Sequence, residues 1–235
     1  QRQMCIRDRA NSIMKRVKEL LENYATPDLL VRRKFEIKKT DGIVIYNPDL
    51  TDSLLLSKLM FVLERFDGGR ITADELLKSV ICIAESEKCT DQDKARDALL
   101  TGDAVIIVDG VPEYIICNFR KWDKRSIAEP PTSTVMRGPR EGFIEDLKTN
   151  LSLLERRLKT PGLAVEKMKI GRVSNTAVAL VYLSNIADPE LIDSVRKKLK
   201  AVDIDALVDS HYVQPLLEER PLSIFHQTGV TEKPD

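Results

Sequence analysis

The sequence predicts an α/β protein: two similar tandem subdomains, each a small mixed β-sheet with flanking helices, the second of them truncated. Three features lead to this prediction. Segments with the apolar period of helices alternate with short apolar runs typical of strands. The same order of elements, a helix, a pair of strands and a helix, recurs along the chain. The second copy stops before the helix and hairpin that complete the first.

The composition is that of a soluble protein with enough apolar material for a core. Of 235 residues, 43% are apolar and 31% are charged, and 37 basic residues balance 37 acidic ones. This balance gives the chain as a whole no field that gathers nucleic acid or an anionic membrane. The apolar runs are far shorter than the roughly 20 residues that span a bilayer. We therefore expect no nucleic-acid partner, and no transmembrane segment in this stretch.

The cysteines are Cys5, Cys82, Cys89 and Cys117, and none has CxxC spacing. Cys82 and Cys117 lie in apolar, strand-like runs, where free thiols behave as small hydrophobic groups. This context favours inert core thiols in a reducing compartment, with a disulfide or a metal site as the alternative.

The first subdomain is predicted to span residues 11–126. Residues 1–10 carry charge but lack the apolar segment of a signal peptide, and we expect them to be non-native or disordered. A helix begins at Asn11 and ends before Pro27. Its apolar face comprises Ile13, Val17, Leu20, Leu21 and Tyr24.

Two strands are predicted next, at residues 31–37 and 42–46, joined by the polar turn KKTD. Thr51 or Asp52 then caps a helix that ends at a pair of glycines. The apolar stripe of that helix is expected to comprise Leu55, Leu59, Val62 and Phe66.

The rest of the first subdomain is predicted to close with a β-hairpin. A short helix begins at Thr72, a buried strand occupies residues 79–84, and a further helix ends at Gly102. The run AVIIV-DG-VPEYIIC then places Asp109 and Gly110 between apolar segments. Both central positions of a type I′ turn need positive φ, which Asp tolerates and Gly prefers, so this run predicts a hairpin with that turn.

The second subdomain is predicted to span residues 143–235. A helix begins near Gly142 and ends at Pro161, and strands follow at 163–170 and 176–182. The apolar stripe of the helix comprises Phe143, Leu147, Leu151, Leu154 and Leu158.

Another helix is predicted to start at Asp188-Pro189, a cap followed by proline at the first helical position. It continues through Leu191, Val195 and Leu199. A short helix at residues 204–208 and a short strand at 221–225 complete the prediction.

The two subdomains repeat each other in sequence. TPDLLV matches TPGLAV, and Tyr46 and Tyr182 are 136 residues apart. The pairs that keep this spacing are Leu50 and Ile186, Asp52 and Asp188, and Leu55 and Leu191. The second copy reaches TEKPD, where the counterpart of TDQDKARDALLTGDAVIIVDG should begin, so we expect a fragment of a longer protein.

Residues 127–142 are predicted to form a linker between the subdomains. Its Gly and Arg residues suit an anion-binding loop, but the Lys-Ser/Thr of a P-loop and the GxGxxG spacing are absent. An interdomain or intersubunit clamp is the preferred reading. The candidate clamp residues are Glu129, Pro130, Pro131, Arg137, Gly138, Pro139, Arg140 and Glu141.

No catalytic constellation is visible, and we predict no enzyme activity and no catalytic, cofactor or metal site. His211 and His226 lie beside no nucleophile motif and are read as surface or capping residues. Asp203 and Asp205 are read as helix-start residues. Trp122 in its basic stretch could stack on a base, but is more simply an anchor for the linker.

Several quoted runs resemble the A subunits of spore germinant receptors, the GerA family. The resemblance rests on EPPTSTVMRGPREGFIEDLKTNLSLLERRLKTPGL, KIGRVSNTAVALVYLSNIADPELI, LLTGDAVIIVDG and the terminal TEKPD. It covers about residues 11 to 235, and IFHQTG departs at His226 from the family's more usual proline-containing version.

The resemblance implies the cytosolic N-terminal region of an A subunit, made of similar α/β subdomains and followed by a membrane domain. Such a receptor sits in the spore inner membrane with B and C subunits, responds to nutrients, and forms an ion-conducting homo-oligomer through the membrane domain. We expect this region to act in assembly and signal transmission in germination. The alternative is a small-molecule (nutrient) binding module with a ligand cleft between the subdomains.

Overall fold

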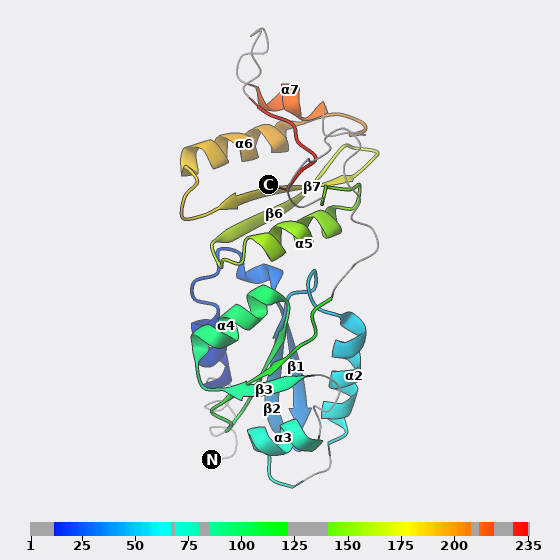
Figure 1. Ribbon diagram of the computed structural model, residues 1–235. Coiled ribbons are helices and arrows are strands. Elements are labelled where there is room, and N and C mark those ends of the chain that lie inside the picture. The colour runs from blue at the N-terminus through cyan, green and yellow to red at the C-terminus, as the bar shows by residue number, and fades with distance from the viewer. Residues whose placement is uncertain are drawn as a thin grey trace. The chain divides into compact units, whose positions relative to one another are not determined.

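The computed structural model divides into two compact units. It describes residues 12–66, 69–79, 85–121, 141–207, 212–218 and 228–234. The first unit comprises residues 1–123 and 155–161, and the second comprises 124–154 and 162–235. Sheets and flanking helices in both units confirm the α/β class (Figure 1). The subdomain boundaries expected from the sequence stay a prediction.

The first unit is built on a five-stranded sheet in the order β1-β2-β4-β5-β3. The strands are β1 Val31–Ile37, β2 Thr40–Tyr46, β3 Ser86–Cys89, β4 Ala104–Val108 and β5 Tyr114–Cys117. Every pair of neighbouring strands is antiparallel, which corrects the expectation of a mixed sheet. For two of these pairs the reason is local: short turns join β1 to β2 and β4 to β5, and strands joined that way must run in opposite directions.

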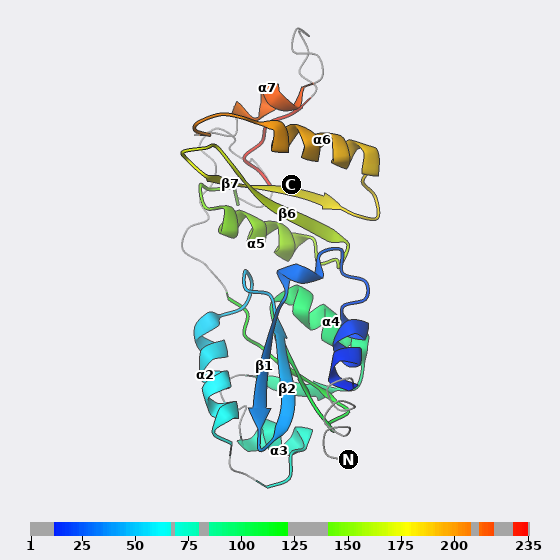
Figure 2. The ribbon, with the colours of Figure 1, turned by 180° about the vertical axis from the view of Figure 1, so that it is seen from behind.

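Helices cover both faces of this sheet (Figures 1 and 2). A 3-10 turn, η1 Pro27–Leu29, precedes β1. On one face, α2 Ser53–Glu64 and α3 Ala73–Ser79 pack over Phe35, Val44, Ile106 and Ile115. On the other face, the predicted N-terminal helix, found at residues 12–20, and α4 Gln92–Thr101 pack over Ile43, Ile45, Val105 and Ile107. The central strands therefore bury side chains on both faces, which explains why their sequences are apolar throughout.

The buried stripe of α2 differs from the one expected. Its buried residues are Leu56, Leu59, Met60 and Leu63, while Leu55, Val62 and Phe66 are only partly buried. Asp52 caps the helix as expected, because its carboxylate accepts hydrogen bonds from the backbone N–H groups of Leu54 and Leu55. Apolar residues surround this helix on almost every side, so periodicity alone misplaced the stripe by about one position.

The hairpin β4–β5 is confirmed, but the type I′ turn lies elsewhere. Gly110 has a φ of +72° and Asp109 is not among the residues with positive φ. A true pair of positive φ values occurs instead at Lys38 (+48°) and Lys39 (+66°), between β1 and β2. The closing pair of that hairpin is Ile37 with Thr40. A two-residue connection demands this geometry even though neither residue is Gly or Asn.

The strand expected at residues 79–84 falls mostly outside the described residues. Ser79 is the last residue of α3, and residues 80–84 lie outside the described part of the chain. The strand in this region, β3, comes later and pairs antiparallel with β5. Its exposed, charged side chains suit the edge of the sheet.

The second unit is built on a hairpin of β6 Leu163–Ile170 and β7 Thr176–Leu183, paired along their whole length. Figures 1 and 2 show α6 Pro189–Ala201 along one face of this hairpin and α5 Leu147–Arg157 along the other. A short helix, α7 Gln214–Leu217, contacts α6. Ile170, Leu199 and Leu207 form the centre of the core between hairpin and α6.

Two helix predictions in the second unit need correction. The helix expected from Gly142 begins five residues later, at Leu147, because Asp146 accepts hydrogen bonds from the backbone N–H and hydroxyl of Thr149 and so caps it there. Leu158 lies beyond the helix and is exposed. Residues 202–207 are not helical, and residue 208 and the strand expected at 221–225 lie outside the described residues.

The backbone repeats across the two units at the predicted spacing of 136 residues. After β2, the N–H groups of Leu50 and Thr51 donate to the Asn47 carbonyl at 3.2 and 2.9 Å. After β7, Ile186 and Ala187 donate in the same way to the Leu183 carbonyl, at 3.1 and 2.9 Å. Asp52 and Asp188 then cap α2 and α6. The units thus share one strand–turn–helix geometry.

Candidate functional site

The clamp residues predicted from the sequence lie almost entirely outside the described residues. Glu129, Pro130, Pro131, Arg137, Gly138, Pro139 and Arg140 all fall in residues 122–140, which we call the connecting segment. Glu141, the last candidate, is described and half-buried. The structure therefore describes the residues that hold the two ends of the connecting segment, each within its own unit.

The upstream end is tied to the first unit by main-chain hydrogen bonds. The Asp52 N–H donates to the Phe119 carbonyl at 2.7 Å, and the Lys121 N–H donates to the Leu50 carbonyl at 2.7 Å. Thr51 and Arg120 form an isolated antiparallel bridge between these bonds. Phe119 itself is fully buried in the core of the unit. The chain therefore leaves the first unit from a fixed position beside the start of α2.

A charged side-chain pair reinforces this end. Arg120 donates from Nε to Asp103 Oδ1 at 2.8 Å and from Nη2 to Asp103 Oδ2 at 2.7 Å, a two-pronged contact. Asp103 is buried, and its second oxygen also accepts from the Thr101 hydroxyl at 3.3 Å. The hydrogen bonds to Asp103 raise the pKa of Arg120 above its usual value. The sequence grouped Arg120 with its basic neighbours and missed this pair.

The downstream end is held in the second unit. The Phe143 N–H donates to the Glu232 carbonyl at 2.7 Å, which ties this end to the last described stretch of the chain. Asn150 brackets Ile144, accepting from its N–H at 2.8 Å and donating to its carbonyl at 2.6 Å. Hydrogen bonds from Thr149 lower the pKa of Asp146, the residue that caps α5. This end is therefore also fixed before α5 begins.

A buried polar pair lies within the first unit, which includes residues 155–161. The Asn47 side-chain amide donates to Glu155 Oε2 at 2.9 Å, and both side chains are buried. Asn47 also accepts from the Asp49 N–H through its side chain, so it organises the turn that leads to α2. Nearby in the same unit, the Ala25 N–H donates to the Pro161 carbonyl at 2.7 Å. Glu155 is the last buried residue of α5, and no sequence pattern singled it out.

A second charged cluster joins both strands of the second unit to α6. Arg196 donates to Glu166 from Nε at 2.7 Å and from Nη2 at 2.6 Å, and the Tyr182 hydroxyl donates to Glu166 at 2.8 Å. These contacts lower the pKa of Glu166 to about 2, with the Arg196 hydrogen bonds as the largest cause. The same contacts raise the pKa of Tyr182. Because every charge here is paired with another protein group, the cluster serves as a structural tie between elements.

The cysteines that the structure describes fit the expectation of inert thiols. Cys89 and Cys117 are free, and burial raises the pKa of Cys117 to about 12. A thiol so far from ionisation is a poor nucleophile. Cys5, Cys82, Trp122, His211 and His226 lie outside the described residues.

Within the described ranges, no three His, Cys, Asp or Glu side chains gather as a metal site. Nor does any helix there combine the length and apolarity that a membrane span requires.

Comparison with known proteins defines the class. The family described as Bacillus/Clostridium GerA spore germination protein matches residues 15–235, and this chain belongs to that family. Spore germination protein KA of Bacillus subtilis (strain 168) is 32% identical over 230 residues, covering 95% of this chain and 42% of that protein. Spore germination protein GerLA of Bacillus cereus is 31% identical over 224 residues, covering 93% and 46%.

A solved structure confirms the fold. The chain resembles the N-terminal domain of the A subunit of the Bacillus megaterium spore germinant receptor GerK3, with a TM-score of 0.65 and 26% identity. The match covers 94% of this chain and 82% of that one. The sequence therefore corresponds to the N-terminal domain of a germinant receptor A subunit, and spans less than half the length of the curated relatives it matches.

Proposed function

We propose that this chain acts in assembly and signal transmission of nutrient-triggered spore germination, as the cytosolic N-terminal region of a receptor A subunit. The observation that carries the proposal is the match of nearly the whole chain both to the GerA family and to the GerK3 A-subunit domain. The intact protein would sit at the spore inner membrane with B and C subunits and form an ion-conducting homo-oligomer.

The anchored ends of the connecting segment suggest how a signal passes through this region. Main-chain hydrogen bonds hold Phe119 and Lys121 to the first unit and Phe143 to the second. Because these hydrogen bonds keep both ends folded, a rotation of either unit moves the connecting segment and is not lost by local unfolding next to it. In this proposal Arg137, Arg140 and Glu141 grip carboxylate and guanidinium partners and set the angle between units or protomers.

A domain replacement in spores tests the proposed role. The A subunit of a receptor with a known nutrient response is given this chain in place of its own N-terminal region, and germination is followed by loss of optical density. We expect a nutrient-dependent response and normal levels of all three subunits. A receptor that assembles fully yet no longer responds contradicts signal transmission through this region, and a receptor that fails to accumulate contradicts the assembly role.

Calorimetry separates this role from that of a nutrient-binding module. An assembly domain gives no saturable heat when the purified chain is titrated with amino acids, sugars or nucleosides. A saturable heat with a fitted stoichiometry contradicts the assembly role as the sole function and favours nutrient binding. A tryptophan fluorescence titration with the same compounds provides an independent check.

A further inference from the structure

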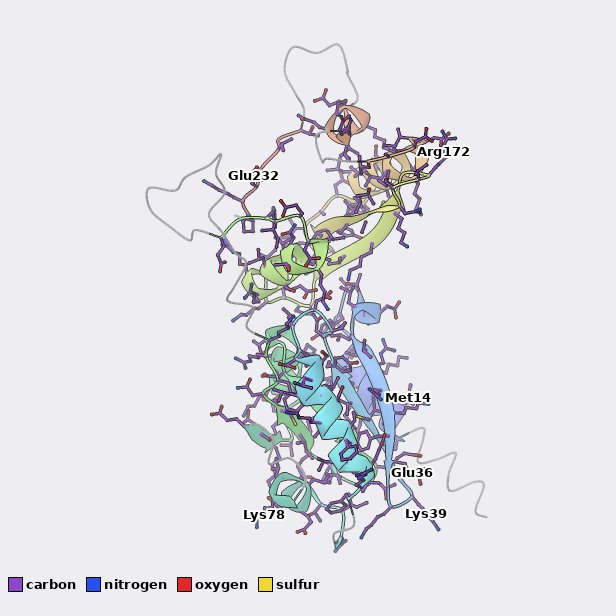
Figure 3. The ribbon with its side chains drawn as sticks, turned by 90° about the vertical axis from the view of Figure 1, so that its right-hand side faces the viewer. Met14, Glu36, Lys39, Lys78, Arg172 and Glu232 are labelled. Atoms are coloured by element: carbon purple, nitrogen blue, oxygen red, sulfur yellow. The ribbon has the colours of Figure 1, made fainter. Side chains whose placement is uncertain are left out.

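One surface of the first unit combines exposed apolar and basic side chains. It is formed by the outer side of α2 together with β1 and its turn, which lie side by side in all three views (Figure 3). We call it the α2–β1 surface, and its residues are Val31, Arg33, Lys38, Lys39, Leu54, Lys58, Phe61 and Arg65. Val31 and Arg33 share the sheet face of Phe35 and Ile37, the face that α2 covers.

The apolar members are exposed, and Leu54 and Phe61 are the most exposed large apolar side chains in the described part of the first unit. Leu54 is 63% exposed, Phe61 54% and Val31 37%. Leu54 and Phe61 are seven residues apart on α2, so they lie on one side of the helix with Lys58 between them. A helix that is apolar on nearly all sides is normally covered on all sides. The outer side of α2 therefore calls for a partner.

Basic groups flank these apolar side chains. The Arg65 guanidinium lies over the Phe61 ring at 3.8 Å, and Lys38 lies over the ring of Phe66 at 5.7 Å. Lys58 sits between Leu54 and Phe61, and Arg33 projects from β1 on the same side. The net charge of the whole chain is zero, so this concentration of positive charge is local. Electrostatic complementarity points to an anionic partner.

The second unit shows that the fold does not require such a surface. At the spacing of 136 residues, Leu54, Lys58 and Phe61 correspond to Glu190, Ser194 and Lys197 of α6. On the first strands, the closing pairs Ile37–Thr40 and Ile170–Thr176 align Arg33 with Glu166. The same backbone thus carries polar or oppositely charged side chains in the second unit. Apolar and basic residues at these positions in the first unit therefore serve something other than folding.

We propose that the α2–β1 surface rests on an anionic lipid membrane, with Leu54 and Phe61 entering the headgroup region and the basic groups binding lipid phosphates. Helices that lie in the membrane interface have this composition, with Leu and Phe side chains flanked by Lys and Arg. Strand addition by a protein partner is disfavoured at β1, since Arg32, Arg33 and Lys34 crowd this edge. A second copy pairing α2 against α2 brings Lys58 side chains together, which like charge opposes.

Vesicle sedimentation tests the proposal with the purified chain. We expect binding to vesicles of equal parts phosphatidylglycerol and phosphatidylcholine, little binding to phosphatidylcholine alone, and weaker binding as salt rises. The double variant Arg33→Glu/Lys58→Ser copies the second unit and should weaken binding about 25-fold, at roughly fivefold for each of the two basic groups lost. The variant Leu54→Glu/Phe61→Lys keeps the net charge and should weaken binding by a similar factor.

A matched control tests whether vesicle binding depends on the α2–β1 surface or only on the net charge of the chain. The variant Lys18→Glu/Lys78→Ser makes the same change in net charge on the N-terminal helix and α3, away from the α2–β1 surface, and should bind vesicles normally. Equal loss in the control, or no preference for phosphatidylglycerol vesicles at low salt, overturns the proposal. The second result assigns the surface to an acidic protein partner instead.

Fluorescence gives a second measurement that does not depend on weakened binding. In a Trp122→Phe background, Phe61→Trp places a single tryptophan on the α2–β1 surface. Its emission should move to shorter wavelength when phosphatidylglycerol vesicles are added, because the indole leaves water. An unchanged spectrum with vesicles that sediment the protein overturns the insertion of Phe61.

Discussion

Asp103 and Arg120 illustrate how single residues fix the exit from the first unit. Asp103 is buried and offers its two carboxylate oxygens to one guanidinium, at 2.8 and 2.7 Å. A buried carboxylate has lost its contacts with water, so it is stabilised only while the guanidinium is present. The pair joins the turn after α4 to Arg120, two residues before the connecting segment.

Removing the guanidinium should therefore be costly. We expect Arg120→Ala to lower the free energy of unfolding by about 2–4 kcal/mol, since it leaves Asp103 buried without its partner. Urea denaturation followed by circular dichroism measures this change. Arg120→Lys should lose less, because an ammonium can still meet one oxygen. A loss below about 0.5 kcal/mol for Arg120→Ala would show that the pair is only a surface contact.

Glu166 gives a prediction for pH. Its pKa is lowered from 4.5 to about 2 by Arg196 and Tyr182 in the folded chain. A carboxyl whose pKa is lower in the folded chain binds a proton more readily in the unfolded chain. The contribution of Glu166 to stability is therefore full above pH 4.5 and disappears as the pH falls toward 2. The stability difference between the chain and Glu166→Gln should therefore shrink over that range. Unfolding curves from pH 6 downward measure it, and a difference independent of pH contradicts the assignment.

At the scale of elements, the β1–β2 hairpin carries an unfavourable turn. Lys38 and Lys39 both have positive φ, a conformation that L-residues other than Asn and Asp adopt at a cost. The pairing of Ile37 with Thr40 forces this geometry on whatever residues lie between. The two lysines at this tip belong to the α2–β1 surface, so its positive charge includes residues with a costly backbone conformation.

Replacing the turn tests this reading. Lys38→Asn with Lys39→Gly should raise the free energy of unfolding by about 1 kcal/mol, because these residues suit a type I′ turn. Thermal and urea unfolding measure the gain. Asp109→Asn is the matched control and should change little, since Asp109 does not have positive φ. A loss of stability in the Asn-Gly variant would mean that contacts of Lys38, such as that with the Phe66 ring, outweigh turn strain.

Features that depend on nearby residues could be predicted from the sequence, whereas features that depend on tertiary contacts could not. The Asp188-Pro189 start of α6 and the limits of β6 could be predicted because capping residues and stop signals lie within a few positions. The stripe of α2 could not, since almost every side of that helix is apolar. Asp103 and Arg120 are 17 residues apart, and only the folded sheet brings them together.

At the scale of the whole molecule, the two units differ at an equivalent position of their shared backbone. In the first unit Leu50 is buried and packs closely against Gly102. A Cβ atom added to this glycine would lie only 2.9 Å from the Cβ of Leu50. The equivalent residue of the second unit, Ile186, is 75% exposed. In the described part of the second unit no counterpart of α4 and β4 covers it. The two units therefore present different surfaces in spite of a shared backbone.

Signal transmission, as proposed, depends most on the connecting segment, where Arg140 is the predicted clamp residue and both ends are anchored. The most direct measurement is the germination rate, together with the oligomeric state, of spores whose full-length receptor carries Arg140→Ala. The exposed Lys169→Ala in β6 serves as control. We predict slower germination or loss of the oligomer for Arg140→Ala and normal behaviour for the control. Unchanged germination and unchanged oligomer formation for Arg140→Ala would contradict signal transmission through this segment.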